Sequence, residues 1–167
     1  MDDQEVRRSA KELAGKLIEE LSQAGETLAV AESCTGGLVA HLLTTIPGSS
    51  AVFGLSAVCY ANEAKSRVLG VSDEDLESCG AVSETVAVQM AMGARRLTGA
   101  TYGLATTGVA GPGGGTPDKP VGTVWFSLAV GQDVLRERLQ FGGSREQIQM
   151  KAAIHALAMI RRYRERQ

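Results

Sequence analysis

Short apolar strands alternate with amphipathic helices along most of this chain, and this alternation constrains its fold more than any other feature. The run TLAVAES, at residues 27–33, has the composition of a short buried strand, and residues 101–107 form another. Helical periodicity follows the strands, and a hairpin pattern surrounds Gly131-Gln132. The order of these elements predicts an α/β fold, a three-layer α/β/α sandwich with a mixed, mostly parallel sheet.

Local signals place the boundaries of the expected elements. Ser72, Ser83 and Ser144 stand where helices should begin, and Gly70 stands where one should end. The apolar, β-rich segment 51–60 is predicted to be a central strand. Helices are expected near residues 6–25, 33–46, 62–69, 72–78, 83–96 and 144–160, and further strands at 123–130 and 133–141.

The composition indicates one folded domain and excludes several kinds of partner. The 167 residues suggest a single domain over residues 1–167, and 44% of them are hydrophobic. Aromatic residues make up only 4%, which argues against a base-stacking platform, and the net charge is -2. The one basic cluster, residues 161–166, matches a helix C-terminus. We therefore expect no nucleic-acid partner.

Targeting signals and cofactor motifs are also missing from the sequence. No apolar run approaches the ~20 residues of a membrane span, and the charged N-terminus does not look like a secretory signal, so we expect no membrane association. Three cysteines without metal-like spacing suggest reduced thiols in the cytoplasm. Two distant histidines argue against a zinc site, so no metal or cofactor is expected. The apolar stripes on both terminal helices leave a homo-oligomer open.

The stretch AESCTGG, residues 31–37, places three candidate nucleophiles in a row: Ser33, Cys34 and Thr35. Loops after strand carboxyl ends hold the ligands of open α/β sheets. The unpaired N–H groups of a first helical turn could hold an oxyanion there. Spacing alone leaves open that Ser33 or Thr35 is only a helix N-cap. Cys34 is the stronger intrinsic nucleophile, but no histidine or aspartate is spaced to serve it.

Two further segments could complete a site at the same edge. In YANEAK, residues 60–65, Lys65 could accept a serine proton if burial or a nearby cation kept it neutral. A solvated lysine on a helix face is the alternative. The loop GVAGPGGGTPDKPVG, residues 108–122, is glycine-rich and suits phosphate or carboxamide binding, although it could equally be a surface loop. Arg145, in the first turn of the last helix, could hold phosphate or lie on the surface.

Taken together, AESCTGGLVAHLLTTIPGSSAVF, YANEAKSRVLGV, GAVSETVA and TTGVAGPGGGTPDKPVGTV resemble the CinA C-terminal domain family, the nicotinamide-nucleotide amidohydrolases. The resemblance covers residues 8–162. It implies a compact α/β/α fold that hydrolyses nicotinamide mononucleotide to nicotinate mononucleotide and ammonia, without a cofactor or metal. Where the family usually has Thr-Tyr-Ser/Thr-Asn, this chain has Cys59-Tyr60-Ala61-Asn62. A non-catalytic module that binds pyridine nucleotides is the alternative.

The resemblance also implies roles for individual residues. Ser33 would be the nucleophile, Lys65 its general base, and Tyr60 would orient the lysine or relay a proton. The expected substrate-binding residues are Cys34, Thr35, Gly36, Ser50, Thr107, Gly108, Gly111, Gly113 and Arg145.

Overall fold

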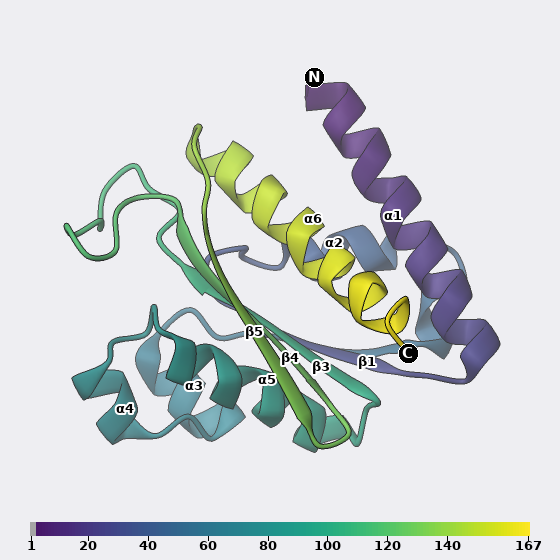
Figure 1. Ribbon diagram of the computed structural model, residues 1–167, viewed down its shortest axis with the longest axis horizontal. Coiled ribbons are helices and arrows are strands. Elements are labelled where there is room, and N and C mark those ends of the chain that lie inside the picture. Colours follow the sequence, from purple (N-terminus) through teal and green to yellow (C-terminus); the bar gives the residue numbers. More distant parts are fainter. Residues whose placement is uncertain (1–2) are drawn as a thin grey trace.

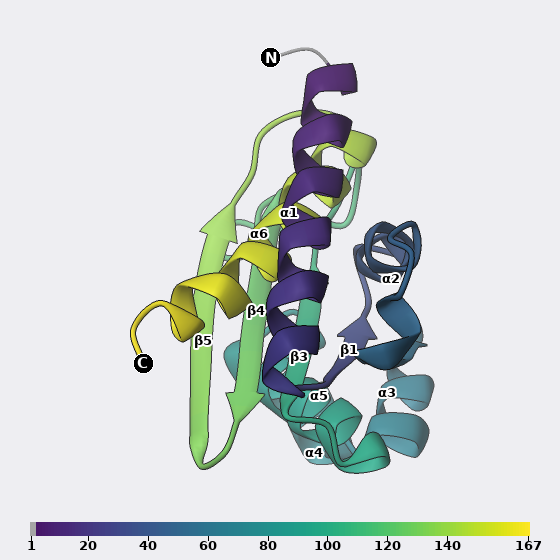
Figure 2. The same ribbon diagram turned by 90° about the vertical axis from the view of Figure 1, so that its right-hand side faces the viewer.

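The computed structural model describes residues 3–167 as three layers, a five-stranded sheet between two layers of helices (Figure 1). The elements in chain order are α1 (Asp3–Ala24), β1 (Leu28–Glu32), α2 (Leu38–Thr44), the 3₁₀ turn η1 (Ser49–Ala51), β2 (Phe53–Val58), α3 (Asn62–Leu69), α4 (Asp73–Ser78), α5 (Glu84–Thr98), β3 (Tyr102–Gly108), β4 (Thr123–Val130), β5 (Asp133–Gln140) and α6 (Arg145–Arg164). Helices α1, α2 and α6 cover one face of the sheet, and α3, α4 and α5 cover the other (Figures 1 and 2). The predicted α/β/α class is confirmed.

The sheet has the strand order β2-β1-β3-β4-β5. Strand β1 pairs in parallel with β2 and β3, whereas β4 pairs antiparallel with β3 and β5. The pairings are therefore evenly mixed rather than mostly parallel, because the hairpin adds two antiparallel pairs. Strand β2 lies at an edge, so the prediction of a central strand at 51–60 is wrong. All six residues of β2 are half-buried or exposed, and Phe53 and Leu55 pack against the clusters on opposite faces of the sheet.

The two faces of the sheet support separate hydrophobic clusters. In β1, the side chains of Leu28 and Val30 belong to the cluster with α1, α2 and α6. Ala29 and Ala31, which alternate with them, belong to the cluster with α3 and α5. This alternation follows from the two-residue period of a strand, and it fixes which face each later residue of the segment addresses.

The local helix signals are confirmed. Ser83 accepts a hydrogen bond from the amide of Val86, and Ser144 forms a full capping box with Gln147. Gly70 ends α3 in the left-handed conformation, with φ of 70°. These boundaries depend on residues only a few positions apart, so the sequence contains all that determines them.

Helices α3 and α5 approach each other closely at Gly93. A Cβ atom placed on Gly93 would lie 2.1 Å from the carbonyl oxygen of Leu69, the last residue of α3. The same oxygen accepts a hydrogen bond of 3.0 Å from Arg96. The position of α3, which carries Lys65, therefore depends on the missing side chain at residue 93.

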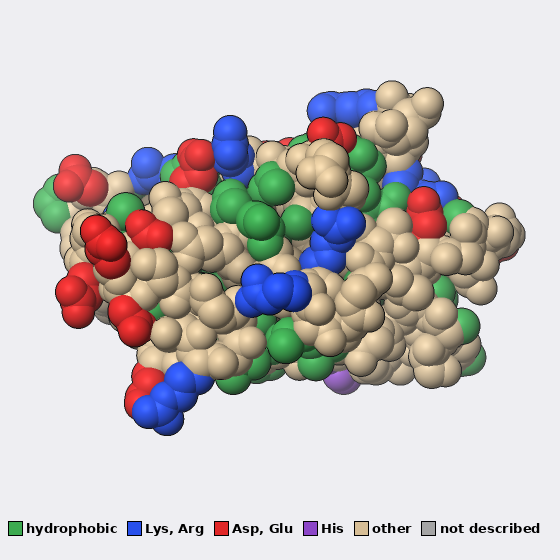
Figure 3. Space-filling view, turned by 90° about the horizontal axis from the view of Figure 1, so that it is seen from below, with side chains coloured by type: hydrophobic (Ala, Val, Ile, Leu, Met, Phe, Trp, Pro, Cys, Tyr) green, Lys and Arg blue, Asp and Glu red, His purple; other side chains and the backbone are tan. Residues whose placement is uncertain are grey.

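The face that carries α3, α4 and α5 has acidic side chains gathered at its α4 end, and hydrophobic side chains with arginine or lysine nearer its centre (Figure 3). The acidic end includes Asp73, Glu74 and Asp75, in the first turn of α4. No continuous basic surface is visible on this face. Among residues 3–167, no helix has both the length and the apolar character needed to cross a membrane.

Candidate active site at the carboxyl edge of the sheet

The carboxyl ends of the three parallel strands bring together segments that are far apart in the sequence (Figure 1). Ser33 follows β1, Cys59 and Tyr60 follow β2, and Thr107 lies near the end of β3. Arg145, the first residue of α6, reaches the same edge and donates a hydrogen bond of 2.5 Å to the Tyr60 hydroxyl. The predicted meeting of these three motifs is present in the fold.

The turn between β1 and α2 is longer than the sequence suggested. Helix α2 begins at Leu38 with Gly37 as its N-cap, and Gly37 has φ of 95°. Gly36 has φ of 61°, so both residues adopt a conformation that favours glycine. Two consecutive left-handed residues prevent a helix from starting at Ser33. That prediction is wrong, and neither Ser33 nor Thr35 is the N-cap.

A buried carboxylate, Glu32, organises this turn, although sequence analysis assigned it no role. Its side chain is completely buried, which is unusual for glutamate. The acidic residue before the glycine turn was the only available signal. Its carboxylate oxygens accept five hydrogen bonds, from the hydroxyls of Thr35 (2.7 Å) and Ser56 (3.1 Å) and the amides of Gly37 (3.0 Å), Val39 (3.1 Å) and Ala40 (2.9 Å).

These hydrogen bonds decide which backbone amides of the turn remain for a ligand. The amide of Gly37 donates to Glu32, and the amide of Gly36 donates to the carbonyl of Ser33. Within the described residues, the amides of Cys34 and Thr35 donate to no backbone or side-chain oxygen. Of the four backbone amides of residues 34–37, those of Cys34 and Thr35 are thus left to donate to a ligand.

Strand alternation separates the neighbouring nucleophile candidates. The amide of Ser33 donates to the carbonyl of Thr106, which continues the β1–β3 ladder by one residue. Alternation beyond Ala31 therefore directs the side chain of Ser33 towards the face of α3. Cys34 belongs to the opposite cluster, with α1, α2 and α6. Only the serine shares a face with Lys65.

Lys65 is almost completely buried in α3, with 1% of its surface exposed. Its ammonium group donates to the carbonyl oxygens of Cys59 (2.9 Å) and Tyr60 (3.0 Å). Cys59 lies on the segment that neighbours Ser33, about one strand spacing (~4.8 Å) away. Burial lowers the pKa of Lys65, and the nearby thiols of Cys59 and Cys34 oppose that shift only in part. The alternative of a solvated lysine is wrong.

Cys34 lies beside the site as a neutral thiol. Burial, assisted by the negative charge of Glu32, raises the pKa of Cys34 to about 12, against the smaller opposing effects of its backbone, Lys65 and Arg145. At pH 7 a thiol with this pKa has only about one thiolate in 100,000 molecules. Because the thiolate is the attacking form, the environment opposes Cys34 as a nucleophile.

Tyr60 and Arg145 form the exposed rim of the site. The Tyr60 side chain is 57% exposed, and its hydroxyl accepts from Arg145. A second guanidinium nitrogen of Arg145 donates to the carbonyl of Gly111, at 2.7 Å. The hydrogen bond from Lys65 to Tyr60 goes to the backbone carbonyl of Tyr60. Tyr60 was expected to orient the lysine or relay a proton: its carbonyl holds the lysine nitrogen, its phenol pairs with Arg145, and the proton relay stays a prediction.

The glycine-rich loop is tied down at its base and open at its tip. The amide of Gly122 donates to the carbonyl of Val109 at 2.7 Å, which closes the loop. The Thr107 hydroxyl donates to the carbonyl of Ala81 at 2.8 Å, so it supports the segment before α5. Gly113, near the tip, is exposed. The loop offers mainly backbone groups at the edge where Arg145 lies.

Ser50 is the predicted site residue that a single chain does not bring to this edge. It lies in η1, immediately before β2, and the carbonyl of Val52 accepts from the amide of Leu28 at the start of β1. The five residues of β1 separate the amino and carboxyl ends of this strand by about 13 Å, so Ser50 lies at the opposite end of the parallel strands from Ser33. The motif order could not reveal this, because it does not specify which end of a strand a loop adjoins.

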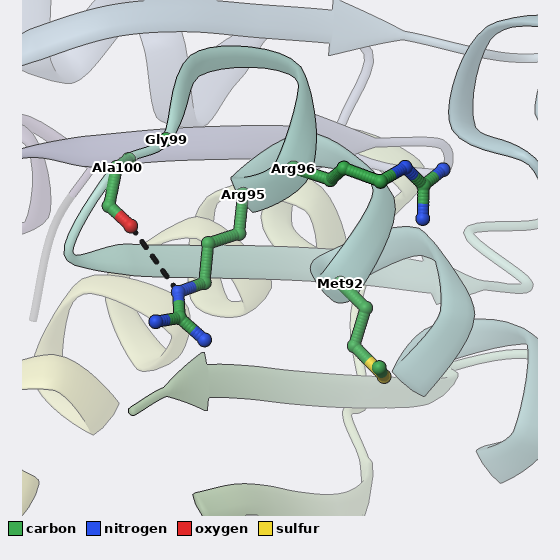
Figure 4. Close-up of a pocket in the computed structure, with 5 residues that line it drawn as sticks. All are labelled: Met92, Arg95, Arg96, Gly99 and Ala100. Carbon is green, nitrogen blue, oxygen red and sulfur yellow. Dashed lines mark hydrogen bonds between the residues drawn. The ribbon is translucent and has the colours of Figure 1, made fainter. Parts of the chain in front are cut away.

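A shallow hollow of about 330 Å³ opens away from this site, where α5 ends and β3 begins. Its arginines already have partners: Arg95 donates to the carbonyls of Ala100 and Gly131, and Arg96 to that of Leu69. These bonds tie the α5 side chains to the backbone where α3 ends, where β3 begins and where the β4–β5 hairpin turns. The residues that line it are Met92, Arg95, Arg96, Gly99 and Ala100 (Figure 4).

The fold and the site define a class: a three-layer α/β/α protein that holds a serine and a buried lysine at the carboxyl edge of its sheet. The chain belongs to the CinA C-terminal domain family, whose family model matches residues 10–164. The resemblance carried by the four sequence motifs is thereby confirmed.

Named relatives and solved structures agree with this assignment. A CinA-like protein from Geobacter metallireducens is 54% identical over 140 residues, covering 84% of this chain and 34% of its own length. One from Desulfovibrio desulfuricans is 52% identical over 155 residues, covering 90% and 36%. The chain thus spans about a third of these relatives. The crystal structure of the competence/damage inducible protein CihA from Agrobacterium tumefaciens has a TM-score of 0.90 and 42% identity, covering 92% of this chain and 94% of that one.

Proposed function

We propose that this chain hydrolyses the carboxamide of nicotinamide mononucleotide, giving nicotinate mononucleotide and ammonia. The observation that carries the proposal is Lys65, a buried lysine in α3 whose pKa is lowered by burial. Strand alternation directs the side chain of Ser33 towards the same face of the sheet. A lysine held partly neutral can accept the proton of a serine hydroxyl. The choice of nicotinamide mononucleotide as the substrate rests on the resemblance of the four sequence motifs to the family.

In the proposed reaction, the Ser33 hydroxyl oxygen attacks the amide carbon while the neutral amine of Lys65 takes the hydroxyl proton. The amides of Cys34 and Thr35 donate to the oxyanion that forms. Lys65 then returns the proton to the leaving nitrogen, ammonia departs, and an ester links Ser33 to the nicotinate group. Water attacks this ester, with Lys65 taking its proton and passing it back to the serine oxygen.

Binding of the nucleotide is assigned to the rim of the site. Arg145 is an exposed cation with a planar guanidinium, and such a group binds phosphate through paired hydrogen bonds. It lies beside Tyr60 and the backbone of Gly111. We assign the phosphate to Arg145, and the ribose and pyridine ring to the backbone of residues 108–115.

One observation favours the alternative of a binding module without catalysis. The Lys65 nitrogen donates to two backbone carbonyls, and within the described residues it makes no hydrogen bond to Ser33. A lysine that served only to hold residues 59 and 60 in place would make the same contacts. Under this alternative, the chain binds nicotinamide mononucleotide without releasing ammonia.

An ammonia-release assay separates the two functions. Nicotinamide mononucleotide is incubated with the wild-type chain beside nicotinamide and its riboside, and binding of each is measured by calorimetry. The proposal predicts ammonia from the mononucleotide at a rate far above that of the other two, because only the mononucleotide carries the phosphate. Saturable binding without ammonia would establish the binding module instead.

A further inference from the structure

We propose that Glu32 is the positioning residue of the turn that carries the nucleophile. Its carboxylate accepts hydrogen bonds from the amides of Gly37, Val39 and Ala40 at the start of α2, and the amides of Cys34 and Thr35 remain for the oxyanion. This inference rests on the proposed function, because it assigns the machinery of that reaction. Glu32 is the last residue of β1 and is directly followed by Ser33. A shift in its side chain would therefore move the attacking group.

The carboxylate of Glu32 has no capacity left for the substrate. Two carboxylate oxygens offer about four lone-pair positions, and here they accept five hydrogen bonds. The side chain is also fully buried. Glu32 therefore acts neither as an acid nor as a base in the reaction, and its effect on catalysis must pass through the residues that it holds.

The donors to Glu32 connect the turn to both neighbouring strands. Ser56 donates from β2, and the Thr35 hydroxyl, which donates to Glu32, also lies 2.8 Å from the hydroxyl of Thr106 in β3. The Thr35 hydroxyl is therefore used inside the protein. Only the amide of Thr35 is left to meet a ligand, which refines the substrate-binding role predicted for this residue.

The arrangement requires an ion rather than a neutral amide. All five groups around the carboxylate are N–H or O–H donors. A glutamine of the same shape replaces one oxygen by an NH₂ group, which is a donor and would face other donors. Glu32→Gln therefore disturbs the turn with little change in side-chain volume, and the disturbance must reach the amides of residues 34–40.

The test compares Glu32→Gln with the matched variant Ser56→Ala, which removes a single hydrogen bond from the strand side of the same carboxylate. We expect kcat for nicotinamide mononucleotide to fall by about 100-fold in Glu32→Gln with KM within about threefold, as for a misplaced reacting group. Ser56→Ala should keep kcat within about threefold. A folded Glu32→Gln variant with wild-type kcat would overturn the inference.

A second measurement does not depend on activity. Hydrogen exchange followed by mass spectrometry should show faster exchange at residues 34–40 in Glu32→Gln than in Ser56→Ala, and unchanged exchange there would also overturn the inference. Should Glu32→Gln fail to fold, Thr35→Val removes one turn-side bond and is expected to lower kcat about tenfold; unchanged kcat would again contradict the inference. If the wild type releases no ammonia while exchange accelerates as expected, the proposed function fails and the positioning of the turn stands.

Discussion

Replacing Gly93 by alanine tests how the packing of the helices positions the proposed base. The Cβ atom of the new residue would lie 2.1 Å from the carbonyl oxygen of Leu69. Contacts of this kind are almost never shorter than 3.0 Å, so the end of α3 must move by about 0.9 Å. The obstacle is backbone, and Arg96 holds it by a hydrogen bond, so it cannot rotate away as a side chain could.

The expected magnitude follows from two opposing effects. Alanine in place of glycine inside a helix favours folding by about 1 kcal/mol. Overpacking of a buried site costs about 3 kcal/mol when backbone must shift. The free energy of unfolding should therefore fall by about 2 kcal/mol, and the melting temperature by about 4–8 °C for a chain of this length. Because Lys65 lies one turn before Leu69, kcat should also fall, by about tenfold or more.

Gly15→Ala is the matched control. Gly15 also lies inside a helix, but a Cβ atom there would meet only the side chain of Ile46, at an ordinary 3.9 Å. This variant should gain about 1 kcal/mol and keep its kcat. Chemical denaturation and ammonia release measure both variants. If Gly93→Ala is as stable and as active as Gly15→Ala, the close approach of α3 and α5 does not position the lysine.

Three further predictions concern single groups of the site. Arg145→Ala should raise KM at least tenfold and change the free energy of unfolding by less than about 1 kcal/mol, because the residue is exposed; unchanged KM contradicts the phosphate role. Cys34→Ala should keep its turnover; if Cys34→Ala abolishes turnover and Ser33→Ala does not, the thiol is the nucleophile. Burial lowers the pKa of Lys65 below 10.5, so the unfolded chain binds more protons, and stability should rise with pH up to that value. Lys65→Met should remove this rise in denaturation curves; its persistence would refute the assignment.

The fold was predictable wherever nearby residues determine it. Ser144 and Gln147 form the capping box that their spacing predicts, and Gly70 ends α3 as expected. The edge position of β2 was not predictable, because the order of strands in a sheet is set by pairing between segments far apart in the sequence. The even mixture of strand pairings likewise depends on contacts between residues far apart in the sequence.

The candidate site was predictable only in part for a related reason. The motifs named Ser33 and Lys65; the structure buries Lys65, and strand alternation directs Ser33 towards the face that carries α3. The role of Glu32 could not be predicted, because glutamate is ordinarily exposed and no local sequence pattern indicates a buried carboxylate with five hydrogen-bond donors. The expected position of Ser50 at the site was wrong for the opposite reason. Its motif is clear, but it precedes β2 and therefore lies at the amino end of the parallel strands.

The central claim is that Ser33 and Lys65 act together as nucleophile and base. Its most direct test is the pH dependence of ammonia release from nicotinamide mononucleotide by the wild type, Ser33→Ala and Lys65→Met. The wild-type rate should rise with pH as the lysine loses its proton, and both variants should lose activity by at least about 1,000-fold. A flat wild-type profile from about pH 6 to 9 with chemistry rate-limiting, or turnover that survives in Ser33→Ala, would contradict the account.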